Sequence, residues 1–403
     1  MTVIADLPNI RPSLLLDFAN SGRVDPRIQC VRASTATCVG RDGKRRVVAA
    51  NVPRIDYDPV TGKCLGLLRE EARTNILTNS VFSGAVSGAP GTAPTNYGFG
   101  VGNGSTEVIP GDIYASLRLT AATAVRHFLT QTNMAVEVGQ YFFSIDCNFY
   151  VASSLGNFMS VSAGTAVFTL RYFVDGVEGT SSSSTGVGKR KMALLLEVTT
   201  AGTLAPRFGI GVANSVVGDV EIGVPQLEKG AYRTSPIPTT TAAVTRAADV
   251  ISLDYVNSRG EGALLLESVV HGASGGGFVA RLHALSTAYI GGAYVDATRP
   301  QLISQIRAAA DASATSATSS GANLSFGSSF KAGISWGVGA FRNSVNGGIS
   351  TEATPASTFP QTSSLLLGAG ANGGTSLMSA TIGRVVVYPA ALTPAQLQRL
   401  TAL

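Results

Sequence analysis

Residues 143–151 read Phe143-Ser144-Ile145-Asp146-Cys147-Asn148-Phe149-Tyr150-Val151, and this stretch decides the class of fold. Apolar side chains at the odd positions alternate with polar ones at positions 144, 146 and 148, which is the period-two pattern of a strand with one buried face. Working outward, the same alternation recurs within residues 168–174, 192–198, 208–212 and 220–224. Strands that recur with turn signals between them indicate a β-sandwich of the jelly-roll type.

A second group of strands is expected in the C-terminal part, within residues 262–270, 277–282, 288–295, 334–342, 365–368 and 381–388. The dipeptides Asp175-Gly176 and Asn346-Gly347 are typical of two-residue hairpin turns. Residues 301–314 contain an alanine run with high helix propensity, but apolar and polar residues alternate at its start. We therefore expect a strand followed by a loop there.

A short helix is expected at the end of the chain. Thr393 is suited to cap it, Pro394 follows at the first helical position, and Gln396 completes a capping box. Leu397 and Leu400 would then dock this helix on a sheet.

The domain organisation follows from a polar, proline-containing stretch at residues 234–241, which separates the two groups of strands. We expect an all-β fold with two antiparallel, lectin-like sandwiches over residues 81–241 and 242–403. Residues 1–80 carry many arginines and few long apolar runs, so we expect short strands and extended chain that need a partner surface. That surface is the rest of the chain, another copy, or another protein.

Composition excludes several classes of protein. Hydrophobic residues make up 45% of the chain, which excludes global disorder. The net charge is +5, and the two basic clusters, Lys44-Arg45-Arg46 and Lys189-Arg190-Lys191, are expected in turns. Nucleic-acid binding is not expected, because no basic stripe with interleaved aromatics occurs. No apolar run approaches 18 residues and no secretory signal is visible, so we expect no membrane insertion and folding in a reducing cytoplasm.

Metal, cofactor and thiol chemistry are not expected either. The four cysteines, Cys30, Cys38, Cys64 and Cys147, form no CxxC pair, so we expect free thiols and no zinc site. Cys147 alternates with apolar residues and is predicted to be a core residue. The three histidines, His127, His271 and His283, lie in no metal-binding or triad spacing, and His127 is expected at a structural strand position.

Two enzyme-like patterns fail on their context, so we expect no enzyme. Residues 272–276 match G-x-S-x-G, and residues 368–373 match G-x-G-x-x-G, but each is followed by a predicted strand where the motif requires a helix. A glycosidase would need two carboxylates close in space. The candidates in one predicted domain are Asp146, Glu178, Glu197, Asp219 and Glu221, which are expected to face solvent.

Sugar binding is the chemistry that the aromatic residues favour, because their faces stack on the CH groups of a pyranose. Tyr289, Tyr294, Asp296 and Arg299 fall near a strand end and loop, where binding residues concentrate, so they are the predicted glycan contacts. The single tryptophan, Trp336, lies in a predicted strand and belongs to the core or to the surface.

Three parts of the sequence resemble a known family or the domains that its members carry. Residues 11–18 (RPSLLLDF), 32–37 (RASTAT), 51–62 (NVPRIDYDPVTG), 66–68 (GLL) and 71–75 (EARTN) resemble the N-terminal region of tailed-bacteriophage and prophage tail proteins. Residues 344–348 (SVNGG), 365–368 (LLLG), 382–389 (IGRVVVYP) and 392–397 (LTPAQL) resemble the final strands of a concanavalin/laminin-G-like jelly roll. Residues 225–232 (PQLEKGAY) with 245–249 (TRAAD) are similar to the end of a carbohydrate-binding-module-like jelly roll.

The resemblance implies a virion structural protein without catalytic residues: a tail fibre, tail-tip or baseplate adhesin that attaches to a host glycan or pilus. Residues 1–80 would attach it to other tail or baseplate proteins, and a homotrimer is expected by analogy with fibres. Two alternatives stay open. One is a tailspike that depolymerises polysaccharide, and the other is a purely structural decoration or connector protein of the virion.

Overall fold

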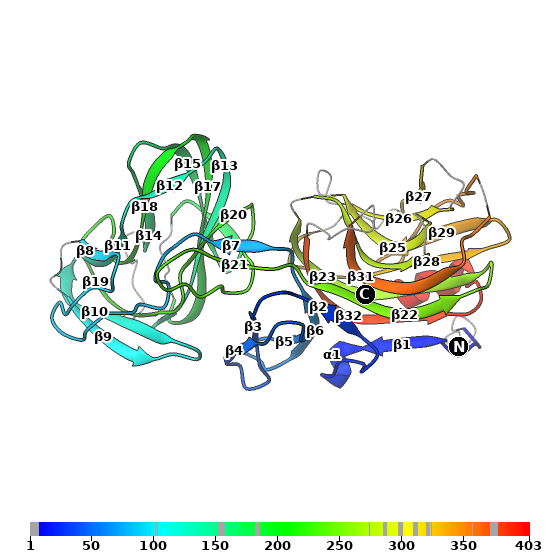
Figure 1. Cartoon of the computed structure of the whole chain (residues 1–403), viewed down its shortest axis with the longest axis horizontal. Helices are drawn as coiled ribbons and strands as arrows, with labels where there is room; N and C mark the ends of the chain where they lie inside the picture. The colour runs from blue at the N-terminus through cyan, green and yellow to red at the C-terminus, as the bar shows by residue number, and fades with distance from the viewer. Residues whose placement is uncertain are drawn as a thin grey trace. The chain divides into compact units, whose positions relative to one another are not determined.

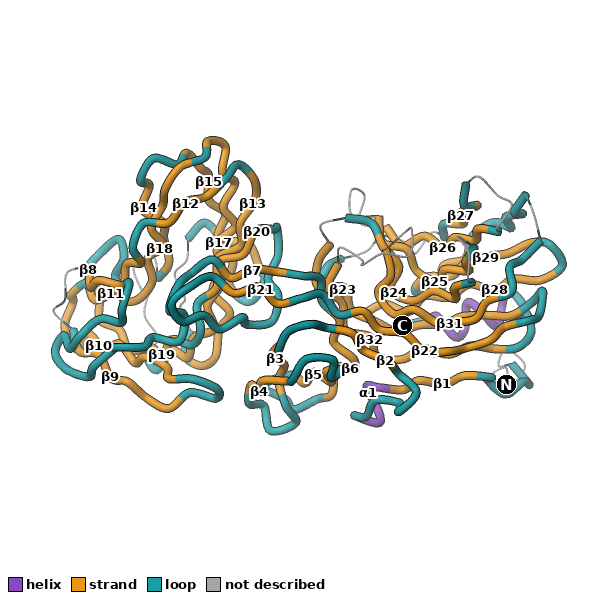
Figure 2. The backbone as a smooth tube through the Cα atoms, in the orientation of Figure 1, coloured by secondary structure: helices purple, strands orange, loops and turns teal. Residues whose placement is uncertain are grey.

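The computed structural model describes residues 8–403, except 101, 103, 152–157, 182–185, 274, 285–287, 297–300, 309–312, 320–322, 324, 357 and 371–377. The chain forms two compact units. Unit 1 comprises Met1–Ala72 with Ala247–Leu403, and unit 2 comprises Arg73–Arg246. In both units the regular secondary structure is almost entirely β-strand, with loops between the strands (Figures 1 and 2).

Unit 1 contains two β-sheets, a small hairpin and two short helices. Its elements are β1 (Leu14–Asp17), α1 (Phe18–Ser21), β2 (Gln29–Val31), β3 (Ala36–Val39), β4 (Arg45–Val48), β5 (Arg54–Tyr57), β6 (Cys64–Arg69), β22 (Val250–Asn257), β23 (Gly262–Ala273), β24 (Gly277–His283), β25 (Tyr289–Asp296), β26 (Gln301–Arg307), β27 (Thr315–Ala317), β28 (Ser329–Gly337), β29 (Ala340–Val345), β30 (Gly348–Ile349), β31 (Thr362–Gly370), β32 (Met378–Tyr388) and α2 (Pro394–Thr401).

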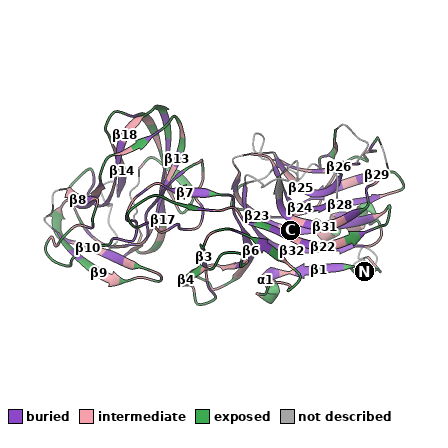
Figure 3. Ribbon diagram, viewed as in Figure 1, coloured by how far each residue is buried: buried purple, intermediate pink, exposed green. Residues whose placement is uncertain are grey.

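The two sheets of unit 1 share one hydrophobic core. The eight-stranded sheet has the order β30-β29-β28-β23-β32-β6-β5, with β1 also paired to β32, and the seven-stranded sheet has the order β2-β22-β31-β24-β25-β26-β27. Leu264 and Ile334 of the first sheet cluster with Leu253, Val279 and Leu365 of the second. Figure 3 shows that the central strands of unit 1 are largely buried, and β26 alternates between buried and intermediate residues. The period-two pattern therefore places one face of each sheet inside the sandwich.

The N-terminal residues belong to both sheets of unit 1. Leu14 of β1 pairs with Val387 of β32, and Gln29 of β2 pairs with Ser252 of β22. The sequence left three partner surfaces open for residues 1–80. The structure shows that N-terminal strands pair with the rest of the same chain. From the sequence we expected three segments, 1–80, 81–241 and 242–403. In the structure the N-terminal segment is not separate, because strands before residue 72 complete both sheets of unit 1.

Unit 2 is a second antiparallel sandwich. Its strands are β7 (Arg73–Asn75), β8 (Tyr97–Gly100), β9 (Ser105–Pro110), β10 (Ala115–Val125), β11 (His127–Gln131), β12 (Met134–Val136), β13 (Gly139–Phe149), β14 (Met159–Ala163), β15 (Val167–Val174), β16 (Val177–Gly179), β17 (Gly188–Thr200), β18 (Gly202–Ile210), β19 (Val216–Ile222), β20 (Gln226–Lys229) and β21 (Val244–Arg246).

Unit 2 also has a single core between its two sheets. A ten-stranded sheet includes the path β16-β15-β17-β13-β19-β10-β9, and a five-stranded sheet includes β12-β18-β11-β8. Phe143 and Ile145 of β13 cluster with Leu129, Phe208 and Ile210 of the smaller sheet. The prediction of an all-β fold with two antiparallel sandwiches and a short C-terminal helix is confirmed.

Several local predictions are also confirmed. Asp175-Gly176 and Asn346-Gly347 each join two paired strands, and all four residues have positive φ, as a type I′ turn requires. The alternating start of residues 301–314 is strand β26. Helix α2 has the full capping box, in which Thr393 accepts from the Gln396 backbone N–H and the Gln396 side chain accepts from the Thr393 N–H.

Three local predictions are wrong. Arg45 and Arg46 of the first basic cluster lie in strand β4, directly after Lys44, and the whole second cluster lies in β17, because exposed positions of a strand accept lysine and arginine as readily as a turn does. Residues 334–342 are two strands, joined by a turn at Val338-Gly339 with positive φ at both residues. A β-branched residue rarely adopts such a φ, so the sequence carried no turn signal there. The alternation of residues 143–151 predicts that Val151 lies on the buried face of a strand. That strand, β13, ends at Phe149, and Val151 is exposed.

The structure shows where Cys147 and Trp336, the two residues considered as core residues from the sequence, lie. Cys147 and Trp336 are buried, the latter with 1% of its surface exposed, so Trp336 belongs to the core. The four cysteines are free thiols, as predicted. Within the described part of the chain, no helix has the length and apolar character needed to cross a bilayer.

The two ends of unit 2 are paired strands. Asn75 of β7 pairs with Val244 of β21, and the hydroxyls of Thr74 and Thr245 are 2.8 Å apart. Unit 2 is therefore an insertion whose ends close on each other, an arrangement that lets a host domain tolerate the insertion.

We predict that unit 1 folds without unit 2. Replacing residues 76–243 by an Asn-Gly dipeptide would join the paired residues Asn75 and Val244 through a type I′ turn. Because unit 1 has its own core, the shortened chain should unfold cooperatively in urea, with fluorescence of the buried Trp336 as the probe. A shortened chain that shows no cooperative transition would contradict this prediction.

A second prediction concerns His127, which begins β11 and is fully buried, in agreement with its expected structural position. Its Nε2 lies 2.9 Å from the Thr106 hydroxyl, and burial lowers the pKa of its imidazole below the value of about 6.5 in an unfolded chain. The unfolded chain therefore binds a proton more readily below about pH 6.5, and unit 2 should lose stability as the pH falls from there.

Hydrogen exchange of the β11 amides, read by mass spectrometry at pH 7 and pH 5, measures this effect. Protection should fall at pH 5 in the wild type, after correction for the intrinsic exchange rate. His127→Gln should flatten that fall, because glutamine does not titrate. An equal fall in both proteins would show that other groups carry the pH dependence.

Candidate functional site

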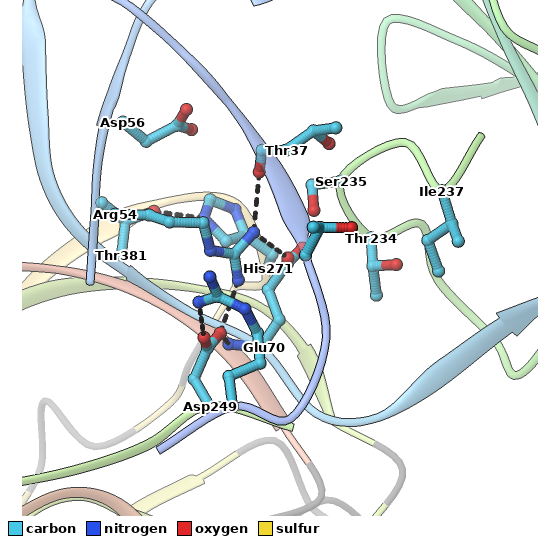
Figure 4. A network of polar contacts seen from close by, with 12 residues as sticks. Thr37, Arg54, Asp56, Glu70, Thr234, Ser235, Ile237, Asp249, His271 and Thr381 are labelled. Carbon is cyan, nitrogen blue, oxygen red and sulfur yellow. Dashed lines mark hydrogen bonds and ion pairs between the residues drawn. The ribbon is translucent and has the colours of Figure 1, made fainter. Parts of the chain in front are cut away.

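The densest group of buried charges lies in unit 1, around the carboxylate of Asp249. Its Oδ1 accepts from Arg32 Nη1 at 2.7 Å, and its Oδ2 accepts from Arg54 Nη2 at 2.5 Å and from the Glu70 backbone N–H at 2.8 Å. Arg54 Nη1 also donates to Glu70 Oε2 at 2.8 Å and to the Thr37 carbonyl oxygen at 2.7 Å. Figure 4 shows Arg54 with dashed lines toward Thr37 and Asp249.

This Asp249 network consists of groups that satisfy one another. The side chains of Arg32, Arg54 and Asp249 are at most 1% exposed, and Arg69 Nε donates to the Asp249 carbonyl oxygen. The nearby carboxylates raise the pKa of the Arg54 guanidinium, although burial opposes this shift. Since its carboxylates bind arginines and are hidden from solvent, the network ties the N-terminal strands to the rest of unit 1.

The glycan contacts predicted from the sequence lie around Phe278, on the inner strands of the seven-stranded sheet. Tyr289 is 4% exposed, and its hydroxyl donates to Gln305 Oε1 at 3.2 Å. The rings of Tyr289 and Tyr294 each lie 5.0 Å from the Phe278 ring, and the Arg281 guanidinium lies 4.7 Å from the Tyr289 ring centroid. The Tyr289 ring therefore has little surface left for a sugar.

The other two predicted contacts are not fully described. Asp296 ends strand β25, but its side chain lies outside the described residues, and Arg299 lies outside them altogether. The same holds for Ser274 of the G-x-S-x-G pattern and for residues 371–373 of the G-x-G-x-x-G pattern. Gly277 begins β24, a strand, where the first pattern would need a helix.

Most of the predicted carboxylates of unit 2 are held by cationic partners. Arg233 binds Asp146 through two N–H groups, Arg171 binds Glu178, and Glu197 is exposed on β17. Asp219 and Glu221 are the two that the structure places together, at successive outward positions of β19. A glycosidase needs a carboxyl group that can reach its substrate, whereas both carboxylate oxygens of Asp219 accept hydrogen bonds from Arg118.

Around these two carboxylates lies an exposed aromatic ring on the outer face of unit 2. We name Arg118, Thr120, Asn148, Tyr150, Asp219 and Glu221 the Tyr150 cluster. Strand register brings it together, because Arg118 pairs with Glu221, Glu221 pairs with Asn148, and Thr120 pairs with Asp219. The alternate residues of the same strands, including Leu119, Val220 and Phe149, point into the core. The outward position of the cluster therefore follows from the period-two pattern.

The polar groups of the Tyr150 cluster are fixed before any ligand arrives. Arg118 donates to both carboxylate oxygens of Asp219, at 2.9 and 2.8 Å, and its guanidinium lies 4.6 Å from the Tyr150 ring centroid. The Tyr150 hydroxyl donates to Glu221 Oε2 at 3.0 Å, and the residue is 45% exposed. Partial burial and this hydrogen bond raise the pKa of the Tyr150 hydroxyl, so it stays a donor.

The arrangement offers an exposed surface for a ligand. An exposed ring is bordered by donors and acceptors whose orientation is set by one another. Among the described residues, no three His, Cys, Asp or Glu side chains gather as a metal site. Tyr150 was not among the residues predicted from the sequence, although its place on the polar side of the 143–151 alternation indicates an outward-facing ring.

Comparisons with known proteins give weak likenesses only. No family model and no curated protein matches the sequence. The Ruminococcus gnavus IT-sialidase CBM40 is 9% identical, with 36% of this chain and 83% of that chain covered, at a TM-score of 0.30. Domain 4 of AbnA, a GH43 extracellular arabinanase from Geobacillus stearothermophilus, is 18% identical, with 42% and 80% covered and a TM-score of 0.28.

Domains LG4-5 of the mouse laminin alpha1 chain are 11% identical, with 65% of this chain and 88% of that chain covered, at a TM-score of 0.25. TM-scores this low carry no argument about this chain. Its description as two β-sandwiches rests on its own strands and their registers.

The Asp249 network leads to a stability prediction. Asp249→Asn keeps the size of the side chain but leaves Arg32 and Arg54 buried with one carboxylate fewer. Breaking a buried ion pair costs about 3–5 kcal/mol, so the free energy of unfolding of unit 1 should fall by that amount in urea denaturation. The control is Asp25→Asn, which breaks the exposed pair with Arg27 and should cost less than about 1 kcal/mol. Equal effects of the two substitutions would contradict the prediction.

Proposed function

We propose that this chain is a carbohydrate-binding attachment protein, and that the Tyr150 cluster contacts the sugar. The observation that carries the proposal is an exposed tyrosine ring beside an arginine–carboxylate pair of fixed geometry. Sugar rings present an apolar CH face and a rim of hydroxyl groups. An aromatic ring stacks on the apolar CH face, and charged side chains bind the hydroxyl groups through strong hydrogen bonds.

The open position of the cluster indicates which sugars fit. The outer face of a sheet can bind sugar residues in the middle of a polysaccharide, whereas an enclosed pocket accepts only the end of one. A surface polysaccharide of a bacterium is therefore a suitable ligand. The polar groups of the cluster are paired with one another, so they favour a neutral sugar, which both donates and accepts hydrogen bonds.

The sequence resemblance to phage tail proteins suggests where the protein acts. The proposed protein is a tail-fibre, tail-tip or baseplate component of the virion, whose neighbours are other tail proteins. Its target is a host glycan or a glycosylated pilus. Weak single contacts become effective when several copies, such as those of a homotrimer, bind one surface together.

A polysaccharide-cleaving tailspike is the second candidate, and the observation in its favour is the adjacency of Asp219 and Glu221. The two candidates differ in a direct assay. A depolymerase releases new reducing ends from host polysaccharide, and Asp219→Asn abolishes that release. A binding protein retains the polysaccharide and releases none.

The test of the proposed site is substitution of its aromatic ring. Tyr150→Ala should weaken binding to a glycan array of bacterial surface oligosaccharides at least about tenfold, because stacking and a hydrogen bond together exceed 1.4 kcal/mol. The matched control is Tyr114→Ala, since Tyr114 is 42% exposed and lies outside the cluster. Unchanged binding by Tyr150→Ala, or equal losses in both variants, would contradict the assignment.

A further inference from the structure

The basic cluster at residues 189–191, which the proposed function does not use, lies at the start of strand β17 in unit 2. Lys189 and Lys191 are exposed and occupy alternate positions, so both face the outer side of the ten-stranded sheet. Arg190 lies between them, points to the opposite side and binds Asp175 at 3.0 Å. The basic cluster therefore presents its two lysines on the face that carries the Tyr150 cluster.

Strand register places Lys189 next to the Tyr150 cluster. Lys189 pairs with Asn148, and Asn148 pairs in turn with Glu221. The Asn148 side chain also hydrogen-bonds to the Tyr150 hydroxyl. Neighbouring strands lie about 4.8 Å apart, so two strand spacings, about 10 Å, separate Lys189 from Glu221. A polysaccharide that lies on Tyr150 can therefore reach Lys189 with a sugar residue a short distance along the same polymer.

The carboxylates of the outer face near Lys189 are each bound by another side chain. The pairs are Asp146 with Arg233, Asp219 with Arg118, and Glu221 with the Tyr150 hydroxyl. Within the part of the chain that the structure describes, Lys189 forms no ion pair. Its exposed ammonium group, with that of Lys191 beside it, gives this end of the face a positive potential. Such a potential attracts anions over roughly 8–10 Å at physiological salt.

We propose that the polysaccharide bound at the Tyr150 cluster is acidic, and that Lys189 and Lys191 bind the anionic group of a sugar residue close to the one on Tyr150. This inference rests on the carbohydrate-binding function proposed above and names the class of its ligand. A neutral residue suits the mutually paired groups of the Tyr150 cluster, whereas an ammonium group binds a carboxylate or a phosphate. The repeating unit of the ligand therefore contains both a neutral and an anionic residue.

The two lysines add selectivity to the affinity that Tyr150 provides. Because both are exposed, each ion pair with the ligand is weak, and salt weakens it further. Their contribution is a preference for acidic over neutral ligands. A positive surface also raises the rate at which an anionic polymer is captured.

The experiment measures the affinity of the full chain for pairs of hexasaccharides by calorimetric titration. One member of each pair alternates glucuronic acid with glucose, galactose or N-acetylglucosamine, and the other is the same compound after reduction of its carboxyl groups to alcohols. The wild type should bind at least one acidic hexasaccharide about three- to fivefold more tightly than its reduced form, which is the size expected of exposed ion pairs. The preference should disappear in about 1 M salt. Hexasaccharides joined by phosphodiester groups test phosphate in place of carboxylate.

The variant that tests the lysines is Lys189→Gln with Lys191→Gln. It should bind the acidic and the reduced compound equally, with the affinity for the reduced compound unchanged. The matched control is Lys44→Gln with Lys63→Gln, which removes the same charge from exposed positions in unit 1 and should keep the preference. Thermal unfolding midpoints of both variants should agree with that of the wild type, which excludes misfolding.

The outcomes separate this inference from the proposed function. A wild type that binds the reduced compounds as tightly as the acidic ones, with binding lost in Tyr150→Ala, overturns the acidic ligand and leaves the proposed function standing. A preference that survives in the Lys189/Lys191 variant, or is lost equally in the control, overturns the assignment to these lysines. Tighter binding of the phosphodiester compounds supports the inference and identifies phosphate as the anionic group. Binding of none of the compounds overturns both proposals.

Discussion

Unit 1 depends on one buried carboxylate, that of Asp249. It lies where the chain returns from unit 2, and it binds Arg32, Arg54 and the backbone of Glu70, which come from three separate parts of the N-terminal region. A lone carboxylate in this position would be strongly unfavourable, and so would two lone guanidinium groups. Each partner is therefore required by the others, and the N-terminal strands are held to the sheets that they complete.

This arrangement joins parts of the chain that lie far apart in the sequence. Arg32 and Arg54 lie in the N-terminal region and Asp249 follows unit 2, and they meet in one network although 217 residues separate the first from the last. The network lies close to the point where unit 2 leaves and returns, because the Glu70 backbone and Asp249 belong to it, and unit 1 has a core of its own. The Tyr150 cluster of unit 2 and the Asp249 network of unit 1 thus belong to separate compact units.

Much of the fold was predictable because its signals are local. Alternation placed Phe143, Ile145 and Cys147 in the core, and the Asn-Gly and Asp-Gly turns were recognised from residues that tolerate positive φ. The turn at Val338-Gly339 was missed because tertiary pairing imposes a positive φ on a valine, against its preference. The candidate site was harder. Tyr289 was chosen for its place near a loop, yet the structure buries it, whereas Tyr150 faces outward on the polar side of a strand that the sequence had defined.

The sequence by itself determined the class of the fold, the two sandwiches, most strands and the capped C-terminal helix, because alternation, turn chemistry and capping act between residues close in the chain. Only the tertiary structure decided that the N-terminal region completes unit 1, that Arg118, Tyr150 and Glu221 form one cluster, and that Lys189 lies beside that cluster. These depend on which strands pair and in which register. That choice follows from the burial of whole faces and from charges that must meet over long separations, and no local pattern encodes it.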